Sequence, residues 1–221
     1  MSHKALVSGV GMIPFRKPGQ SEAWDLMAAE AARRALADAG IGYTEVQQAY
    51  VGYVYGESTS GQSALYHVGL SGIPIVNVNN NCSTGSTALF LARQAVEAGI
   101  VDVALALGFE QMNPGALAAV YNDRKPAMEM FSDAMTRAQT LDPKAPGAAQ
   151  FFGGAGAEHQ RKYGTQTSTF AKISEKARRH AANNPCAVFR APLSLHDLLQ
   201  SPHIYGPLTR YQCCPPTRGA A

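Results

Sequence analysis

The sequence predicts an α/β fold in which a parallel-dominated sheet is covered by helices on both faces. Apolar runs typical of strands occur at residues 46–54, 74–79 and 101–107, and helical patterns separate them. The run at 101–107 has no polar alternation after Asp102, as expected of a strand covered on both faces. Strands that alternate with helices favour a parallel, doubly wound sheet.

The other elements of this first half have signals of their own. Residues 5–10 form a short apolar run that is expected to be a buried strand. Ser21 is expected to cap the first helix, and Gly40 supplies its stop. A helix is expected over residues 84–98, where the sequence is apolar nearly all round, as in a helix buried in a core.

After Gln111 the hydrophobic pattern becomes weaker and mainly helical. Helices are expected over residues 152–163 and 168–182, where apolar side chains recur at helical spacing. Ser194 and Asp197 form a capping-box pattern that opens a short third helix. We therefore predict three segments, which are an α/β domain over 1–112, a mainly helical loop domain over 113–205 and a return to the first domain over 206–221.

Composition and charge exclude several classes of protein. No run approaches the roughly eighteen apolar residues of a membrane span, and a net charge of +3 is too small to indicate nucleic acid. The four cysteines are expected to be free thiols. Cys213 and Cys214 are adjacent and lack the spacing of metal ligands, so no metal site is expected. No N-terminal address is visible, which favours a cytoplasmic protein, with the peroxisome as the eukaryotic alternative.

The stretch NNNCSTGSTALFLA at residues 79–92 contains the candidate nucleophile. It places Cys82 between a strand and the N-terminus of a helix, where unpaired N–H groups and the helix dipole favour an anion such as a thiolate. The backbone N–H of Cys82 could also donate to an oxyanion on an attached acyl group. Gly85 allows close approach of a ligand or backbone. On the residues alone, a buried and inert cysteine is the alternative.

The stretch VNVNNNCSTGSTALFLARQAV resembles the nucleophile segment of thiolases, of the sterol-carrier-protein type. The likeness continues, in the same order, through GVGMIPFRKPG, DVALALGFEQM, FFGGAGAEHQRKYGT, HAANNP and QCCPPTRGAA. It covers essentially the whole chain and matches the N-terminal half of the family's proteins. The resemblance therefore implies the thiolase-type sheet, interrupted by a helical loop domain.

The resemblance also implies an activity. In the family, a cysteine attacks the ketone of a 3-oxoacyl-CoA, a carbon–carbon bond breaks, and CoA collects the acyl group; the reverse is a Claisen condensation. Cys82 would be the nucleophile. Gly85, His159, Lys172 and Arg179 are candidate substrate contacts, the last two on a basic helix face that could meet the phosphates of CoA. Acyl-CoA and CoA are then substrates, no cofactor is permanently bound, and the full-length protein is a homodimer.

Some of the family's catalytic groups are not found in this sequence. The family's histidine lies in a Gly-His-Pro segment, which does not occur here, and its second cysteine and oxyanion segment belong to the second half. The chain is therefore predicted to be truncated before the last strand of its first domain, leaving one edge of the strand at 103–107 unpaired. A non-catalytic protein that binds acyl-CoA or lipid is an alternative, and so is a cysteine hydrolase.

Overall fold

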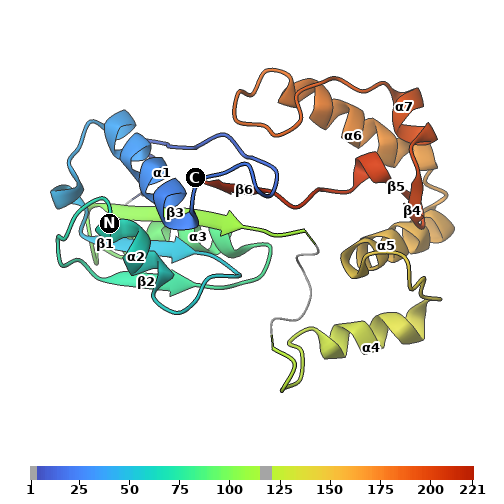
Figure 1. Cartoon of the computed structure of the whole chain (residues 1–221), viewed down its shortest axis with the longest axis horizontal. Helices are drawn as coiled ribbons and strands as arrows, with labels where there is room; N and C mark the ends of the chain where they lie inside the picture. The colour runs from blue at the N-terminus through green and yellow to red at the C-terminus, as the bar shows by residue number, and fades with distance from the viewer. Residues whose placement is uncertain (1–3, 115–120) are drawn as a thin grey trace. The chain divides into compact units, whose positions relative to one another are not determined.

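The computed structural model describes residues 4–114 and 121–221, which belong to two compact units. The first unit is Met1–Pro114 together with Pro216–Ala221, and the second is Gly115–Pro215 (Figure 1). The return to the first unit comes at Pro216, whereas the sequence places it at residue 206.

A four-stranded sheet forms the centre of the first unit. Its strands are, in spatial order, β2 (Ile75–Val78), β1 (Gln48–Gly52), β3 (Ala104–Gln111) and β6 (Arg218–Ala220). β1 runs parallel to both β2 and β3, and β6 runs antiparallel to β3. The mainly parallel sheet is therefore confirmed. The strands predicted at 46–54, 74–79 and 101–107 are also confirmed, although β3 begins and ends later than predicted.

The short strand β6 corrects one prediction and confirms another. The sequence predicts no strand of the first domain after residue 206, and this is wrong, because Arg218–Ala220 pairs with residues 109–111 of β3. On its other side β3 pairs with β1 over residues 104–108. Among the described residues no strand pairs with 104–107 on the side of β6, so the predicted unpaired edge is confirmed there.

Helices cover both faces of this sheet, as predicted. They are α1 (Trp24–Ala39), α2 (Ser60–Tyr66) and α3 (Thr84–Glu97), with the 3-10 turn η1 (Tyr43–Glu45) before β1. Successive residues of a strand point to opposite faces, and Val51 and Tyr50 of β1 belong to two separate hydrophobic clusters. α1 and α2 contribute to the cluster of Val51, and α3 contributes to that of Tyr50.

The helix α3 is buried along one face only, which corrects the predicted all-round burial. Ala88, Ala92 and Ala95 pack against the sheet and are at most 6% exposed. Leu89 and Phe90, on the other side, are 55% and 53% exposed. The apolar sequence of α3 therefore gives this unit a partly apolar surface.

The boundaries of α1 confirm one predicted signal and correct the other. Gly40 ends the helix in the left-handed conformation, with φ 70°, as predicted. Ser21 does not cap it, because α1 begins at Trp24 and the cap residue is Ala23. The Ser21 hydroxyl instead donates to the carbonyl of Glu22.

The predicted strand at residues 5–10 is wrong. These residues form no strand, and Leu6, Val7 and Val10 are 84%, 75% and 69% exposed. A strand needs a backbone partner, and β6 supplies one only from Ile13 onward, whose N–H donates to the Ala220 carbonyl. The preceding segment lies along α1 instead of joining the sheet.

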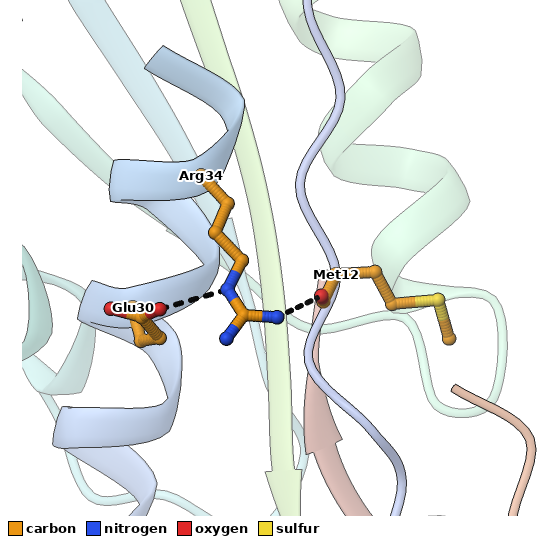
Figure 2. Close-up of polar contacts among 3 residues, drawn as sticks. All are labelled: Met12, Glu30 and Arg34. Carbon is orange, nitrogen blue, oxygen red and sulfur yellow. Dashed lines mark hydrogen bonds and ion pairs between the residues drawn. The ribbon is translucent and has the colours of Figure 1, made fainter. Parts of the chain in front are cut away.

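Close backbone contact and two polar links hold this segment on α1. A Cβ atom added at Gly11 would lie 2.2 Å from the Ala31 carbonyl oxygen, so the two backbones meet where only glycine fits. The Val10 N–H donates to the Asp38 carboxylate at 2.8 Å. Figure 2 shows the second link, in which Arg34 of α1 donates to the Met12 carbonyl and to the Glu30 carboxylate.

The second unit is mainly helical, as the sequence predicts. Its elements are α4 (Glu129–Ala138), α5 (Gly147–Tyr163), α6 (Thr167–Ala181), α7 (Leu195–Gln200), the two-stranded sheet of β4 (His203–Tyr205) and β5 (Leu208–Thr209), and η2 (Arg210–Gln212). The capping box is confirmed, since the Ser194 hydroxyl accepts from the Asp197 N–H at 3.1 Å. None of the helices in 4–114 and 121–221 has the length and apolarity of a membrane span.

Candidate nucleophile turn

The candidate nucleophile lies in the turn that joins β2 to α3. β2 ends at Val78 and α3 begins at Thr84, so Cys82 lies two residues before the helix. Its side chain is exposed, and its sulfur lies 3.8 Å from the Asn81 Oδ1 atom. The predicted strand–turn–helix setting of Cys82 is therefore present, and the thiol is open to solvent, which a buried and inert cysteine would not be.

Hydrogen bonds within the turn fix its backbone. Asn81 takes the left-handed conformation, with φ 49°, which asparagine adopts more readily than most residues. The Asn80 carbonyl accepts from both the N–H and the hydroxyl of Ser83, at 3.2 and 2.9 Å. The Asn81 carbonyl accepts in the same way from the N–H and the hydroxyl of Thr84, at 3.1 and 2.5 Å.

The start of α3 lies close to the sheet, and the absence of a side chain at Gly52 makes room for it. A Cβ atom at Gly52, the last residue of β1, would lie 2.8 Å from the Thr84 methyl group. A Cβ atom at Gly108 of β3 would lie 3.8 Å from the Gly85 Cα atom. The N-terminus of α3 thus lies at the carboxyl end of β1, the edge where parallel α/β sheets commonly bind ligands.

The first turn of α3 offers hydrogen-bond donors beside this cysteine. N–H groups in the first turn of a helix have no carbonyl four residues earlier within the helix, so they can serve an anion. In α3 the N–H groups of Thr84 and Thr87 already donate to the Asn81 and Ser83 carbonyls, so the donors for an anion would be those of Gly85 and Ser86. Gly85 belongs to this turn, and a Cβ atom there would meet nothing within 4 Å. Gly85 thus follows Cys82 by three residues at the start of α3, with open space where a side chain would lie.

The other predicted contact residues lie in the second unit. His159 is on α5, where its ring centroid lies 4.7 Å from that of Tyr163. Lys172 and Arg179 are both exposed on α6. Of the five predicted site residues, the first unit therefore contains only Cys82 and Gly85.

The first unit also contains a hollow that the sequence does not predict. It has a volume of about 500 Å³ and lies beside the carboxyl ends of β1 and β3, with Cys82 not among its lining residues. Its wall includes Trp24, whose ring stacks on Phe109 at 5.1 Å, and Gln111, whose buried Oε1 atom has no partner. Polar residues that directly follow two predicted parallel strands are the signal that could have indicated it.

Cys82 is expected to be the most reactive of the four cysteines at neutral pH. It is exposed beside the first turn of α3, whereas Cys186 and Cys213 are half-buried. Burial, together with the neighbouring Cys214, raises the pKa of the Cys213 thiol and so lowers its thiolate fraction. Substoichiometric iodoacetamide followed by peptide mapping checks this. Cys214, which is also exposed, is the internal comparison, and preferential labelling of Cys213 or Cys214 would contradict the assignment.

The fold and the nucleophile turn define a thiolase-type domain. The chain matches the family described as "Thiolase, N-terminal domain" over residues 6–193. Because that match covers most of its length, the chain belongs to the thiolase family.

Individual relatives agree with this membership. The chain is 50% identical to sterol carrier protein 2 of Gallus gallus, over all of this chain and 41% of that protein. It is 33% identical to the benzoylsuccinyl-CoA thiolase subunit BbsB of Thauera aromatica, over all of this chain and 54% of that one. Among solved structures, an Ltp2-ChsH2(DUF35) aldolase shares the fold with a TM-score of 0.76 at 22% identity, over 98% of this chain and 54% of that chain. The chain thus spans about half the length, or less, of these proteins.

Proposed function

We propose that this chain carries the nucleophilic half of a thiolase-type acyl-CoA acyltransferase, and that Cys82 becomes acylated. The observation that carries the proposal is the exposed Cys82 thiol on a hydrogen-bonded turn at the N-terminus of α3. Membership of the thiolase family and the named thiolase subunit among the relatives support it.

The reaction begins when Cys82 loses its proton and its sulfur attacks the ketone carbon of a 3-oxoacyl-CoA. N–H groups at the start of α3, with that of Cys82 itself, can donate to the oxyanion that forms. The bond between the second and third carbons then breaks, which leaves an acyl group on the Cys82 sulfur and releases an acyl-CoA enolate that takes up a proton. The thiol of free CoA attacks the acyl-cysteine in the second step, and the Cys82 thiol is regenerated.

Proton transfer in these steps needs an acid/base group near Cys82. Within the described part of the first unit the only histidine is His67, and its Nε2 atom lies 2.9 Å from the Asp25 carboxylate. The hydrogen-bond neighbour of the Cys82 sulfur is Asn81, not a histidine. These contacts do not favour a cysteine hydrolase, which requires a histidine within reach of its cysteine.

The substrates in this proposal are an acyl-CoA and free CoA, with no permanently bound cofactor. Lys172 and Arg179 are exposed on α6 and could meet the phosphates of CoA, and His159 on α5 is also accessible. The family resemblance further suggests a homodimer for the full-length protein. A cytoplasmic or peroxisomal location is part of the same proposal.

A second candidate is a protein that binds lipid or acyl-CoA without catalysis. It is favoured by the name of one relative, sterol carrier protein 2, which denotes a carrier. The two candidates differ at Cys82, since a carrier binds its ligand equally well after Cys82→Ala, whereas an acyltransferase loses covalent transfer altogether.

Intact-mass spectrometry of the chain after incubation with acetoacetyl-CoA tests the proposal. We expect one acetyl group per chain, and peptide mapping should place it on Cys82. Cys82→Ala should remain unmodified, and Cys214→Ser, which changes another exposed cysteine, should be acetylated like the wild type. An unmodified wild-type chain, or acetylation that persists in Cys82→Ala, would refute the proposed role.

A further inference from the structure

We propose that Thr84 is a positioning residue for Cys82, and that it acts by holding the backbone of the turn on both sides of Asn81. The proposal rests on the proposed function only in taking Cys82 as the nucleophile. It starts from a polar side chain that is 4% exposed and lies two residues beyond the cysteine.

The hydroxyl of Thr84 bridges two peptide groups of the turn. It donates to the Asn81 carbonyl at 2.5 Å and accepts from the Asn80 N–H at 2.8 Å. These groups flank the left-handed Asn81, whose φ of 49° is a sparsely populated conformation. Such a conformation persists only where its surroundings fix it, and the hydroxyl of Thr84 does so from within the fold.

The methyl group of Thr84 is fixed as well. It lies against the backbone of Gly52, where a Cβ atom would come within 2.8 Å of it. The side chain is therefore packed between β1 and the turn, and its hydroxyl has little freedom to find other partners. Through this contact, the position of the turn that carries Cys82 depends on the position of the sheet.

Other hydroxyls of the segment have weaker claims to this role. Ser83 is exposed and its hydroxyl bonds only the Asn80 carbonyl, which also accepts the Ser83 N–H. Thr87 donates to the Ser83 carbonyl and accepts from the Asn80 side-chain amide, so it supports a side chain and the first helical turn. Of these three hydroxyls, only that of Thr84 bonds a backbone donor and a backbone acceptor on either side of Asn81.

The function of this arrangement is to place the Cys82 sulfur and the nearby N–H groups in one geometry. A small alkylating reagent needs only an exposed thiolate. Acyl transfer from a thioester or ketone also needs donors aligned with the forming oxyanion. Loss of the Thr84 hydroxyl should therefore slow acyl transfer more than alkylation.

The test compares Thr84→Val, which keeps the shape and the contact with Gly52, with Thr84→Ser, which keeps the hydroxyl. Thr84→Val leaves the Asn80 N–H without its buried partner, and we expect acylation of Cys82 by acetoacetyl-CoA to slow about tenfold. Alkylation of Cys82 by iodoacetamide should change by no more than about twofold. Thr84→Ser should keep both rates within about twofold of the wild type.

Equal acylation rates in Thr84→Val and the wild type would overturn the proposal. An equal fall of the acylation rate in Thr84→Val and Thr84→Ser would also overturn it. A parallel loss of acylation and alkylation would indicate a merely structural role and also overturn it. Amide hydrogen exchange at Asn80, whose N–H donates to the Thr84 hydroxyl, gives a readout that needs no acyl transfer. The Asn80 amide should exchange about tenfold faster in Thr84→Val than in Thr84→Ser, and Val51 should be unchanged. If the wild type takes up no acyl group, the proposed function fails, and the hydrogen-exchange comparison still decides the role of Thr84. If Thr84→Val does not fold, the wild type alone decides, because a rapidly exchanging Asn80 amide would refute the proposed role of Thr84.

Discussion

The 221-residue chain is expected to accept one acyl group on Cys82 and to show no sustained thiolysis. Attack requires the cysteine, which is present and exposed. Turnover also requires an acid/base group and a full set of oxyanion donors. Acid–base catalysis raises the reaction rate about 10²–10⁴-fold, and each oxyanion donor raises it about 10²–10³-fold. No Gly-His-Pro segment occurs in the sequence, and the described histidine of the first unit, His67, is bonded to Asp25.

The measurement is the steady loss of acetoacetyl-CoA in the presence of CoA, with Cys82→Ala as the control. We expect the wild type to consume one acetoacetyl-CoA per chain in an initial burst, and then to show a steady rate equal to that of Cys82→Ala. The rate contributions of catalytic groups that act as a unit are not additive. The turnover rate is therefore expected to stay far below that of a complete thiolase even if one missing group is partly replaced. Sustained turnover that depends on Cys82 would show that a group of this chain, such as His67 or His159, serves as the acid/base.

Elements with strong local signals could be predicted from the sequence. The strands at β1, β2 and β3 are apolar runs, and α3 follows a turn of polar residues, so pattern alone places them. The position of Cys82 between a strand and a helix could be predicted for the same reason, because local sequence patterns indicate both elements. The resemblance to thiolases then suggested a role for that position, and the family match confirms the resemblance itself.

The errors have a common physical cause, which is that long-range contacts decide the outcome. Residues 5–10 have the composition of a strand, but no strand of the described residues pairs with them, and Gly9, with Gly11 just after, packs on α1 instead. The sequence of α3 is apolar nearly all round, yet periodicity does not reveal whether anything covers Leu89 and Phe90. The contact between Thr84 and Gly52 joins segments far apart in the sequence, so the role of Thr84 could not be predicted.

Replacement of Gly11 by valine is expected to destabilise the first unit strongly. A Cβ atom at residue 11 would lie 2.2 Å from the Ala31 carbonyl oxygen and 2.4 Å from the Ala35 nitrogen, both of which are backbone atoms of α1. A helix backbone cannot yield as the end of a side chain can, so the N-terminal segment must move away. That movement would also break the hydrogen bond from Arg34 to the Met12 carbonyl.

We expect Gly11→Val to lower the free energy of unfolding by about 3 kcal/mol, the upper part of the usual range for overpacking. Urea denaturation followed by the fluorescence of Trp24 measures this, because Trp24 is the only tryptophan and belongs to the first unit. Gly85→Ala is the matched control. A Cβ atom there meets nothing within 4 Å, and alanine in a helix is favoured over glycine by up to about 1 kcal/mol, so its stability should equal or exceed that of the wild type. A Gly11→Val chain that unfolds at the wild-type urea concentration would show that the backbone of residue 11 does not pack on α1.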